Sequence, residues 1–495
     1  MKVLVIGLDG ATWDLIRPWA ENGILPNLNF LRKNGVYGNL TSTIPPVTVP
    51  AWISFVTGKN PGKIGCYDFL TPRKSLNNLR PITSKDIHGK TFYEILDENG
   101  KKCIILNLPG TYPPRIKEIV ITSLLTQGDN FIFPPELIHE IPQLKNWRLV
   151  SDRSLYVNGK IIEYINDFIQ LEKTRFEGAK ELLKKKPWDF FFLLFNGTDA
   201  LQHIMYDKIK EKKGDVVKLY KEIDEYIGWF INNVPKDTNI LVISDHGFRV
   251  YKKTFFINGW LRKEGYLKIK RSVKSRTIRH RSEMETENAI SKRINIKLPI
   301  FLLNYYTWIY PIYAKLKKIL PIELRTDVAQ PDSKYSIAYC TSDPASNFGY
   351  IYINDKKRFI DGIVSEKNYE TYRNEIITKL KKLKDPKTKE TIIKKVWKKE
   401  EIYFGSKLTT APDIILEANE KYYVTYSPPI TKYFDKSRVH NKHTRNGIFL
   451  AFGLDLKKGY NLDIKIYDLA PTILFMFDIP IPKDMDGRVL KEIFK

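Results

Sequence analysis

An unbroken apolar run, "NILVISDHGF" at residues 239–248, ends on Asp245 and His246 just before a glycine. Runs that are apolar throughout, instead of alternating with polar residues, are typical of strands buried on both faces of a parallel sheet. The sequence therefore predicts a buried strand with two polar side chains at its end. Three other runs have the same form: "KVLVIGLDG" (2–10), "KCIILNLPG" (102–110) and "DFFFLLFNGTD" (189–199).

Helix-like stretches separate these runs, for example residues 91–100, which end on a glycine, and residues 171–186. A repeated order of strand and helix predicts a doubly wound α/β fold with a mostly parallel sheet flanked by helices. In such sheets the ligand binds beyond the carboxyl ends of the strands. We therefore expect function at the polar residues that follow the predicted strands, namely Asp9, Asn107, Asp199, Asp245 and His246.

The chain of 495 residues is long enough for more than one domain. Nine Lys or Arg and a single Glu fall within residues 262–281, and an aromatic run follows at 298–314. We predict a catalytic core formed by residues 1–251 and 331–495, interrupted by a basic, aromatic-rich cap or lid at 252–330. The core resumes with a late strand and a closing helix near the C-terminus.

The net charge of +25 indicates a surface that attracts anions, such as phosphorylated metabolites, nucleic acid or an acidic membrane face. Three scattered cysteines support neither a disulfide framework nor a zinc knuckle, and they favour a reducing compartment. The N-terminal apolar run is too short for a secretory signal, and Pro311 breaks the longest uncharged stretch. These features predict a cytoplasmic protein.

Four histidines bear on a metal site, because imidazole and carboxylate are the usual ligands of zinc and related ions. His203 lies four residues after Asp199, a spacing that puts both side chains on one face of a helical turn. His246 is adjacent to Asp245, and the glycine turn that follows lets both face the crevice. His443 begins a segment directed into a strand and is preferred to the neighbouring His440. Taken singly, each of these features also fits a turn, a helix cap or a surface ion pair.

Thr48 stands in "VTVPAWISFVTG", where Pro50 and the residues after it predict a helix that begins at Thr48. A hydroxyl at a helix N-terminus faces free backbone amides and the positive end of the helix dipole, where a phosphoryl group settles. Beside a metal ion such a hydroxyl can be activated as a nucleophile. An ordinary capping role is the alternative.

Two nucleotide-binding motifs are excluded. "GKNPGKIG" at 58–65 has its glycines too close together for a P-loop, and Ile64 stands where Ser or Thr must hold magnesium. No GxGxxG occurs, so a dinucleotide site has no support.

Seven segments together carry a family resemblance. They are "GLDGATWD", "PNLNFLRKNGVYGNLTSTIPPVTVPAWISFVTGKNPGK", "LNLPGTYPP", "NGTDALQH", "ISDHGF", "HTRNGIFLAFG" and "YDLAPTILFMFDIPIPKDMDGRVL". The chain resembles the alkaline phosphatase superfamily, most closely the branch of type I phosphodiesterase and nucleotide pyrophosphatase-like proteins. The resemblance implies an alkaline phosphatase-like fold and a metal-dependent hydrolase of phosphate esters.

The resemblance also implies a pair of divalent ions, usually zinc, with manganese and magnesium as alternatives. One ion would be held by Asp199, His203 and His443, and the other by Asp9, Asp245 and His246. Thr48 would contact the second ion and act as the nucleophile that forms a phosphothreonine intermediate. Lys59 and Arg445 are candidates for contacts with the non-bridging phosphate oxygens, with solvated surface charge as the alternative for each. The implied substrate is a phosphorylated small molecule or a lipid-linked phosphate.

The sequence departs from the family pattern at two positions. Ile64 stands where a histidine commonly follows "PGK", and Phe69 replaces an asparagine that nucleotide pyrophosphatases carry. Phosphomonoesterase action and a transfer like that of phosphoglycerate mutases are therefore alternatives within the superfamily. A sulfatase is excluded, because a Cys or Ser followed by Pro-x-Arg is required at the nucleophile.

From a different class, the chain could be a non-catalytic protein that binds anionic lipid or nucleic acid through its basic blocks at 262–281 and 379–399. Against this class, lysine-rich stretches are usually solvated faces. Nucleic acid is the less favoured of the two partners. The segment at 298–320, which is apolar and aromatic with flanking lysines, fits a peripheral membrane contact or a lid over the crevice. Packing inside the cap is the alternative.

Overall fold

A ten-stranded sheet forms the centre of the protein in the computed structural model. The structure describes residues 1–210, 216–270, 294–298, 322–326, 330–426, 434–435 and 440–495. The strand order is β24-β2-β23-β9-β1-β8-β5-β6-β7, with β25 paired to β2. The bounds are β1 (Lys2–Leu8), β2 (Val36–Thr41), β5 (Cys103–Leu108), β6 (Ile119–Thr122), β7 (Ile132–Phe133), β8 (Phe190–Phe195), β9 (Thr238–Ile243), β23 (Asn446–Phe452), β24 (Tyr460–Asn461) and β25 (Ile464–Lys465).

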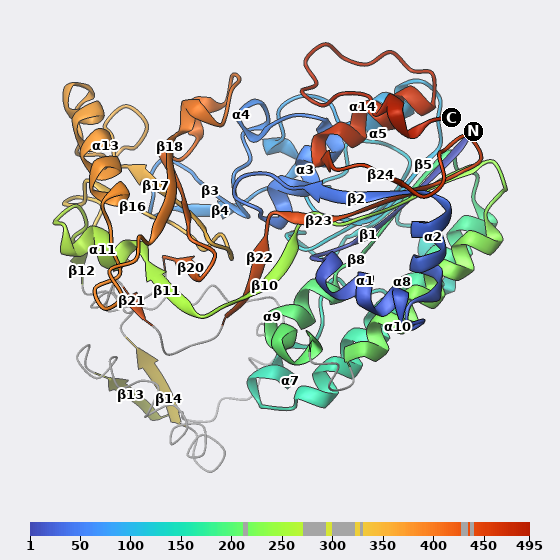
Figure 1. The fold of residues 1–495 in the computed structure, drawn as a ribbon, viewed down its shortest axis with the longest axis horizontal. Coiled ribbons are helices and arrows are strands. Elements are labelled where there is room, and N and C mark those ends of the chain that lie inside the picture. The colour runs from blue at the N-terminus through green and yellow to red at the C-terminus, as the bar shows by residue number, and fades with distance from the viewer. Residues whose placement is uncertain (211–215, 271–293, 299–321, 327–329, 427–433, 436–439) are drawn as a thin grey trace.

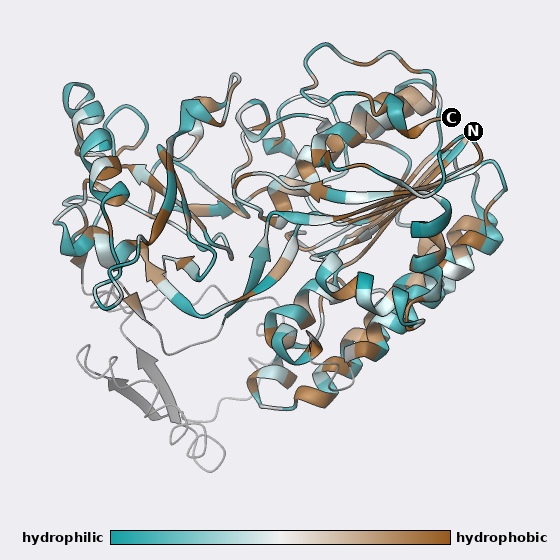
Figure 2. Cartoon of the chain, in the orientation of Figure 1, coloured by the Kyte–Doolittle hydropathy of each residue, from teal (hydrophilic) through white to brown (hydrophobic). Residues whose placement is uncertain are grey.

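The five inner strands from β9 to β6 run parallel, and the antiparallel pairs of this sheet are β2–β23, β23–β9 and β6–β7. The prediction of a mostly parallel sheet flanked by helices is confirmed. The four apolar runs of the sequence are β1, β5, β8 and β9, and almost every residue in them is buried. Figure 2 shows these central strands as hydrophobic along nearly their whole length.

Helices cover both faces of the sheet (Figure 1). One face of the sheet packs against apolar side chains from the helices that follow β1, β7 and β8. The other face packs against apolar side chains from the helix that begins at Thr48, a helix before β5 and a helix near the C-terminus. The first group is α1 (Trp13–Glu21), α2 (Pro26–Asn34), α8 (Ile161–Lys185), α9 (Gly197–Lys210) and α10 (Val216–Asn233). The second group is α3 (Thr48–Thr57), α5 (Phe92–Glu98) and α14 (Leu469–Met476).

Two predicted helices show how local sequence sets the element bounds. At the start of α5, Thr91 and Glu94 form a reciprocal capping box, and Gly100 follows the helix at a φ of +72°. The helix predicted at 171–186 begins ten residues earlier, at Ile161. Its apolar face continues backward through Ile165 and Phe168, which are buried against the sheet.

A second unit has its own apolar core beside the sheet. It holds a four-stranded sheet in the order β16-β17-β19-β18. Its elements are β11 (Lys253–Phe256), α11 (Ile257–Lys263), β16 (Ala338–Tyr339), β17 (Phe348–Ile353), α13 (Glu366–Lys381), β18 (Ile393–Lys398), β19 (Ile414–Ala418) and β20 (Tyr422–Thr425). Phe255 and Trp260 share this core with Tyr350 and Leu416. Residues on both sides of position 331 therefore pack together, while the domain division at 252–330 stays a prediction.

The segment at 298–320 falls almost entirely outside the described residues, since residues 299–321 are not described. Within the described parts of the chain, no helix is long and apolar enough to cross a membrane. The remaining short elements are β3 (Leu70–Pro72), β4 (Leu79–Pro81), β10 (Gly247–Tyr251), β12 (Ile269–Lys270), β13 (Ile294–Leu298), β14 (Ile322–Thr326), β15 (Gln330–Pro331), β21 (Phe434–Asp435), β22 (His440–Thr444), α4 (Pro61–Ile64), α6 (Leu137–Glu140) and α7 (Arg153–Val157).

Phe192 lies at the centre of β8 with no exposed surface, and its ring centroid is 5.6 Å from that of Trp52 and 5.8 Å from that of Phe55. We expect Phe192→Ala to lower the free energy of unfolding by about 3–5 kcal/mol, because the ring leaves a cavity between sheet and helix. Leu454→Ala, at an exposed position, should change it by less than about 0.5 kcal/mol. The urea midpoint of unfolding measures both. An unchanged midpoint in Phe192→Ala would contradict this packing.

Candidate functional site

The carboxyl ends of three neighbouring parallel strands meet at one edge of the sheet. Gly7 of β1 pairs with Leu194 of β8 on one side and with Ile243 of β9 on the other, so the three strands end at the same level. The turn after β1 depends on Gly10, which has a φ of +68° and whose added Cβ would meet the ring of Phe248. The edge thus collects the residues that follow these strands.

The first cluster consists of Asp9, Asp245 and His246, all buried. Their ligand atoms lie within 4.8 Å of one another. His246 Nε2 is 3.2 Å from Asp245 Oδ2 and 3.6 Å from Asp9 Oδ1. The backbone N–H of Gly10 donates to Asp245 Oδ1 at 3.1 Å and holds that carboxylate in place.

The second cluster consists of Asp199, His203 and His443, again with ligand atoms within 4.8 Å. Asp199 and His203 lie one turn apart on α9, and Asp199 Oδ1 is 3.6 Å from His203 Nε2. His443 arrives from β22, which pairs antiparallel with β10 and sets His443 opposite Phe248. His443 Nε2 lies 3.3 Å from Asp199 Oδ1.

The two clusters adjoin. His246 Nε2 is 3.9 Å from Asp199 Oδ1, and the rings of His246 and His443 stack with centroids 3.6 Å apart. The structure therefore brings together all six side chains that the sequence proposed as metal ligands. Asp199 and His203 are only half-buried, so the second cluster faces the more open side.

Each cluster histidine has a backbone carbonyl beside its Nδ1 atom. His203 Nδ1 lies 3.2 Å from Asn441 O, His246 Nδ1 3.3 Å from Gly247 O, and His443 Nδ1 3.1 Å from Pro46 O. A carbonyl oxygen only accepts, so the Nδ1–H donates and Nε2 keeps its lone pair. A ligating histidine is commonly oriented in this way.

The donor set suits divalent cations. The Nε2 atoms of His203 and His443 face each other at 2.9 Å with both lone pairs directed inward, an arrangement that calls for a positive charge between or beside them. One buried oxygen on each cluster carboxylate accepts no hydrogen bond: Asp9 Oδ1, Asp199 Oδ1 and Asp245 Oδ2. Unpaired buried carboxylate oxygens are costly, and a cation would satisfy them.

The pKa values of Asp9, Asp245 and the three cluster histidines shift in the direction that burial of a charged group produces. Burial, reinforced by Asp245 and Asp199, raises the pKa of Asp9 well above its usual value. Burial raises the pKa of Asp245 to about 8. Burial likewise lowers the pKa of His203 and of His443 to about 3, and that of His246 in the same direction.

Thr48 lies beside the first cluster. It is the first residue of α3, as predicted, and it is buried. Its Oγ1 is 3.2 Å from His246 Nε2. The N–H groups of the first turn of a helix have no acceptor within the helix, so a hydroxyl and free amides point toward the same place.

Four other residues named in the sequence analysis make contacts of their own. The Lys59 ammonium forms an ion pair with Asp484 near the C-terminus. Arg445 is exposed, and its Nε donates to Ser42 O at 3.3 Å. His440 packs its ring against Tyr423, with centroids 4.7 Å apart. Asn107 is buried and donates to Leu194 O at 2.9 Å, so it links two strands.

The sequence interpretation missed a loop of the second unit that supports His443. Ala345 O accepts the backbone N–H of His443 at 2.7 Å, and the Tyr251 hydroxyl donates to His443 O at 2.7 Å. The same loop carries Ser342, whose hydroxyl, with that of Tyr350, donates to the buried Asp68. Burial raises the pKa of Asp68 to about 6. The turn-forming composition of "TSDPAS" (341–346) was the one local signal for this loop.

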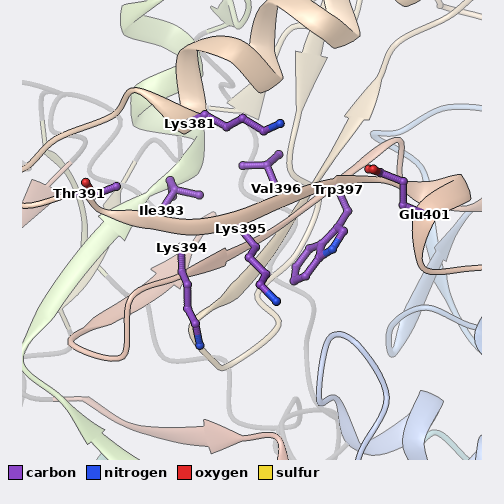
Figure 3. Close-up of a pocket in the computed structure, with 8 residues that line it drawn as sticks. All are labelled: Lys381, Thr391, Ile393, Lys394, Lys395, Val396, Trp397 and Glu401. Atoms are coloured by element: carbon purple, nitrogen blue, oxygen red, sulfur yellow. The ribbon is translucent and has the colours of Figure 1, made fainter.

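A pocket of about 500 Å³ lies away from both clusters, on α13 and β18. Figure 3 shows Lys394, Lys395 and Trp397 on β18 and Lys381 on α13. Lys394 forms an ion pair with Glu417 at 3.0 Å, and Lys395 Nζ lies 5.9 Å from the Trp397 ring centroid. This is part of the lysine-rich block at 379–399. Lysines on an edge strand such as β18 keep it from pairing with other chains.

The doubly wound sheet and the acidic, histidine-rich site at its carboxyl edge define a phosphoester hydrolase of the alkaline phosphatase superfamily. The chain belongs to the type I phosphodiesterase/nucleotide pyrophosphatase family, whose model matches residues 3–300, more than half of the chain. It is thus a phosphodiesterase/pyrophosphatase-type hydrolase of a metal-dependent family. No curated protein matches the chain in sequence.

Solved structures share this fold at low sequence identity. Murine ectonucleotide pyrophosphatase/phosphodiesterase 5, an inactive threonine-to-alanine variant in complex with AMP, is 15% identical with a TM-score of 0.55, and the match covers 100% of both chains. Phosphonoacetate hydrolase from Sinorhizobium meliloti 1021, in complex with phosphonoacetate, is 13% identical with a TM-score of 0.55. That match covers 95% of this chain and 94% of the other. These likenesses show the fold.

Proposed function

We propose that this protein hydrolyses phosphodiesters or pyrophosphates through a phosphothreonine intermediate on Thr48. The observation that carries the proposal is the place of the Thr48 hydroxyl at the head of α3. Its Oγ1 lies 3.2 Å from His246 Nε2, in the first of two adjoining clusters of carboxylate and imidazole side chains. An isolated capping threonine would need no such surroundings.

The two clusters fit two divalent ions, with Asp199, His203 and His443 around one and Asp9, Asp245 and His246 around the other. Thr48 is proposed to contact the second ion as well. Mixed imidazole and carboxylate donors favour zinc, with manganese and magnesium as alternatives. Two such ions would neutralise phosphate charge and lower the pKa of the attacking hydroxyl.

The residues of the chain then carry out the transfer. Thr48 Oγ attacks phosphorus as its proton passes to solvent. The bond from phosphorus to the leaving oxygen breaks, that oxygen takes up a proton, and a phosphothreonine ester forms. Water next attacks the same phosphorus and breaks its bond to Oγ. A proton from that water restores the Thr48 hydroxyl, and the remaining phosphate product is released. The free N–H groups of Thr48 and Val49 at the head of α3 bind the non-bridging oxygens throughout. Lys59 and Arg445 remain candidates for further contacts to these oxygens, although Lys59 would first have to leave Asp484.

The substrate is proposed to be a phosphorylated small molecule or a lipid-linked phosphate. The AMP complex of the murine structure, made with a variant that lacks one threonine, supports both the ligand class and a threonine nucleophile. We further propose that residues 252–330 belong to a cap over a core formed by residues 1–251 and 331–495.

A substrate panel tests the proposal. We expect the purified protein to hydrolyse bis(p-nitrophenyl) phosphate or a nucleoside diphosphate ester in the presence of Zn²⁺, Mn²⁺ or Mg²⁺, and to lose turnover on chelation. Phosphomonoesters with the same leaving groups serve as comparison substrates for the diesters. Faster hydrolysis of a monoester than of every diester would make the protein a phosphomonoesterase. Metal-independent turnover, or none on any substrate, would contradict the two-metal mechanism.

A further inference from the structure

Three surface loops of the second unit are tied into one patch: residues 72–78, 331–337 and 355–362. Ile360 N–H donates to Lys74 O at 2.9 Å, and the Ser75 hydroxyl donates to Asp361 Oδ2 at 2.8 Å. These two bonds join the first loop to the third. The first and third loops are therefore held side by side.

The middle loop is attached to both of the others. The Asn77 side-chain amide donates to Pro331 O at 3.1 Å, which joins the first loop to the second. The buried Asn354 amide donates to Ser333 O at 2.7 Å and to Ser336 O at 3.0 Å, so the strand that leads into the third loop also fastens the second. Pro331 is also where the chain returns from the predicted insertion.

This patch carries the two most exposed large hydrophobic side chains of the described residues. Ile360 is 84% exposed and Tyr335 is 67% exposed. The two preceding residues fix the loop on which Ile360 is exposed. Phe359 is buried, and Arg358 is paired with Asp355 and Asp413. A single exposed hydrophobic residue is ordinary on a protein surface. Two such residues on loops that are joined by hydrogen bonds indicate a candidate binding surface.

Exposed cations lie on the same three loops as these side chains, and the carboxylates of the loops are hydrogen-bonded or paired. Asp361 accepts from Ser75, Asp355 pairs with Arg358, and Asp332 Oδ1 accepts the backbone N–H of Lys334 at 3.3 Å. Of the exposed cations, Lys357 has a carboxylate partner, the exposed Glu366 at 3.4 Å. The exposed cations of the three loops are Arg73, Lys74, Lys334, Lys356 and Lys357.

We propose that this patch docks the protein on an anionic lipid bilayer, with Ile360 and Tyr335 inserted at the interface and the surrounding Lys and Arg against the headgroups. Two exposed apolar side chains on loops that also carry exposed cations match a bilayer surface, which has an apolar interior and negatively charged headgroups. A nucleic acid would use the cations but would leave an aliphatic tip such as Ile360 in water. The proposal does not rest on the hydrolytic activity.

Vesicle co-sedimentation of the full chain tests this inference. We expect binding at low ionic strength to vesicles of phosphatidylcholine and phosphatidylglycerol, and loss of binding in salt or with pure phosphatidylcholine. The double variant Ile360→Ser/Tyr335→Ser should bind about 10-fold more weakly, because both insertions are lost. Ile162→Ser, at an exposed position on α8, is the matched control and should bind like the wild type.

The outcomes separate the alternatives. Wild-type binding by the double variant would overturn the proposal, as would equal binding to neutral vesicles or no binding to anionic ones. If the double variant instead lost affinity for a single-stranded oligonucleotide and not for vesicles, the patch would be a nucleic-acid surface and the lipid proposal would be wrong. Turnover of a soluble diester is measured in parallel and should be unchanged in the double variant, so a failure of docking is distinct from a failure of the hydrolase.

Discussion

Thr48→Ala is expected to lower the rate of phosphodiester hydrolysis by about 10³-fold or more while leaving both metal clusters loaded. The reason is geometric. The Thr48 hydroxyl lies 3.2 Å from His246 Nε2 at the head of α3, where a methyl group supplies no oxygen to attack phosphorus. Each cluster keeps its three other ligand side chains in this variant, so bound metal should remain near two ions per chain.

The measurement combines single-turnover kinetics with rapid acid quenching and mass analysis of the quenched protein and its proteolytic peptides. The wild type should show a phosphoryl adduct on the peptide that contains Thr48, and Thr48→Ala should show none. Thr48→Ser is the matched control, since it keeps a hydroxyl and should retain measurable turnover. Full metal-dependent turnover in Thr48→Ala would show that water attacks directly and would end the assignment of Thr48 as nucleophile.

Four of the candidate ligands were predictable because parallel strands end at a common edge. Asp9, Asp245 and His246 directly follow strands whose apolar runs are legible in the sequence, and β9, β1 and β8 are adjacent in the sheet. Asp199 follows the third of these strands. The spacing of four residues to His203 then fixes a fifth side chain on the same helical turn. Local rules and one topological rule were sufficient for this part.

The choice between His440 and His443 shows what local rules leave open. The two residues are three positions apart on β22, so the alternation of the strand sends them to opposite sides. The register of β22 against β10 decides which side faces Asp199, and that register depends on long-range pairing. The sequence favoured His443 only because it begins the segment that leads into the next predicted strand.

Lys59 illustrates a second limit. Lys59 is a candidate for a phosphate contact, and its ammonium pairs with Asp484, more than 400 residues away in the sequence. The loop that supports His443 through Ala345 was likewise invisible, because a turn-rich segment gives no sign of the strand it will contact. Contacts of this kind follow from the folded chain and have no signature in sequence spacing.

Removing the metals is expected to make stability fall as the pH rises from about 6.5 to about 8. In the metal-free folded protein, burial raises the pKa of Asp245 from 3.8 to about 8 and that of Asp9 in the same direction, so the folded state keeps protons that the unfolded chain has released. Stability then falls with pH by about 1.4 kcal/mol per pH unit for each such proton. A bound dication replaces these protons, so the loaded protein should be more stable and nearly independent of pH over this range.

The histidines act in the opposite direction and only at lower pH. The pKa of His203 and of His443 falls from 6.5 to about 3, so the folded state holds fewer protons between these values and stability rises with pH there. Above about pH 6.5 the slope from this contribution diminishes, and the contribution is nearly complete by about pH 7.5, so the retained carboxylate protons increasingly set the slope. The thermal midpoints of chelated and Zn²⁺-loaded protein from pH 6.5 to 8 measure the slope of stability against pH. Proton release on metal binding is a second measure of the retained protons.

Asp245→Asn should flatten the slope of the chelated protein, because it removes a titrating group from the first cluster. His440→Ala is the matched control: it removes a histidine that packs on Tyr423 outside both clusters, so the slope should stay as in the wild type. A chelated protein whose midpoint stayed constant or rose from pH 6.5 to 8 would mean that Asp9 and Asp245 share no retained proton. The first cluster would then hold its negative charge without a cation, and the case for a metal at that position would fail.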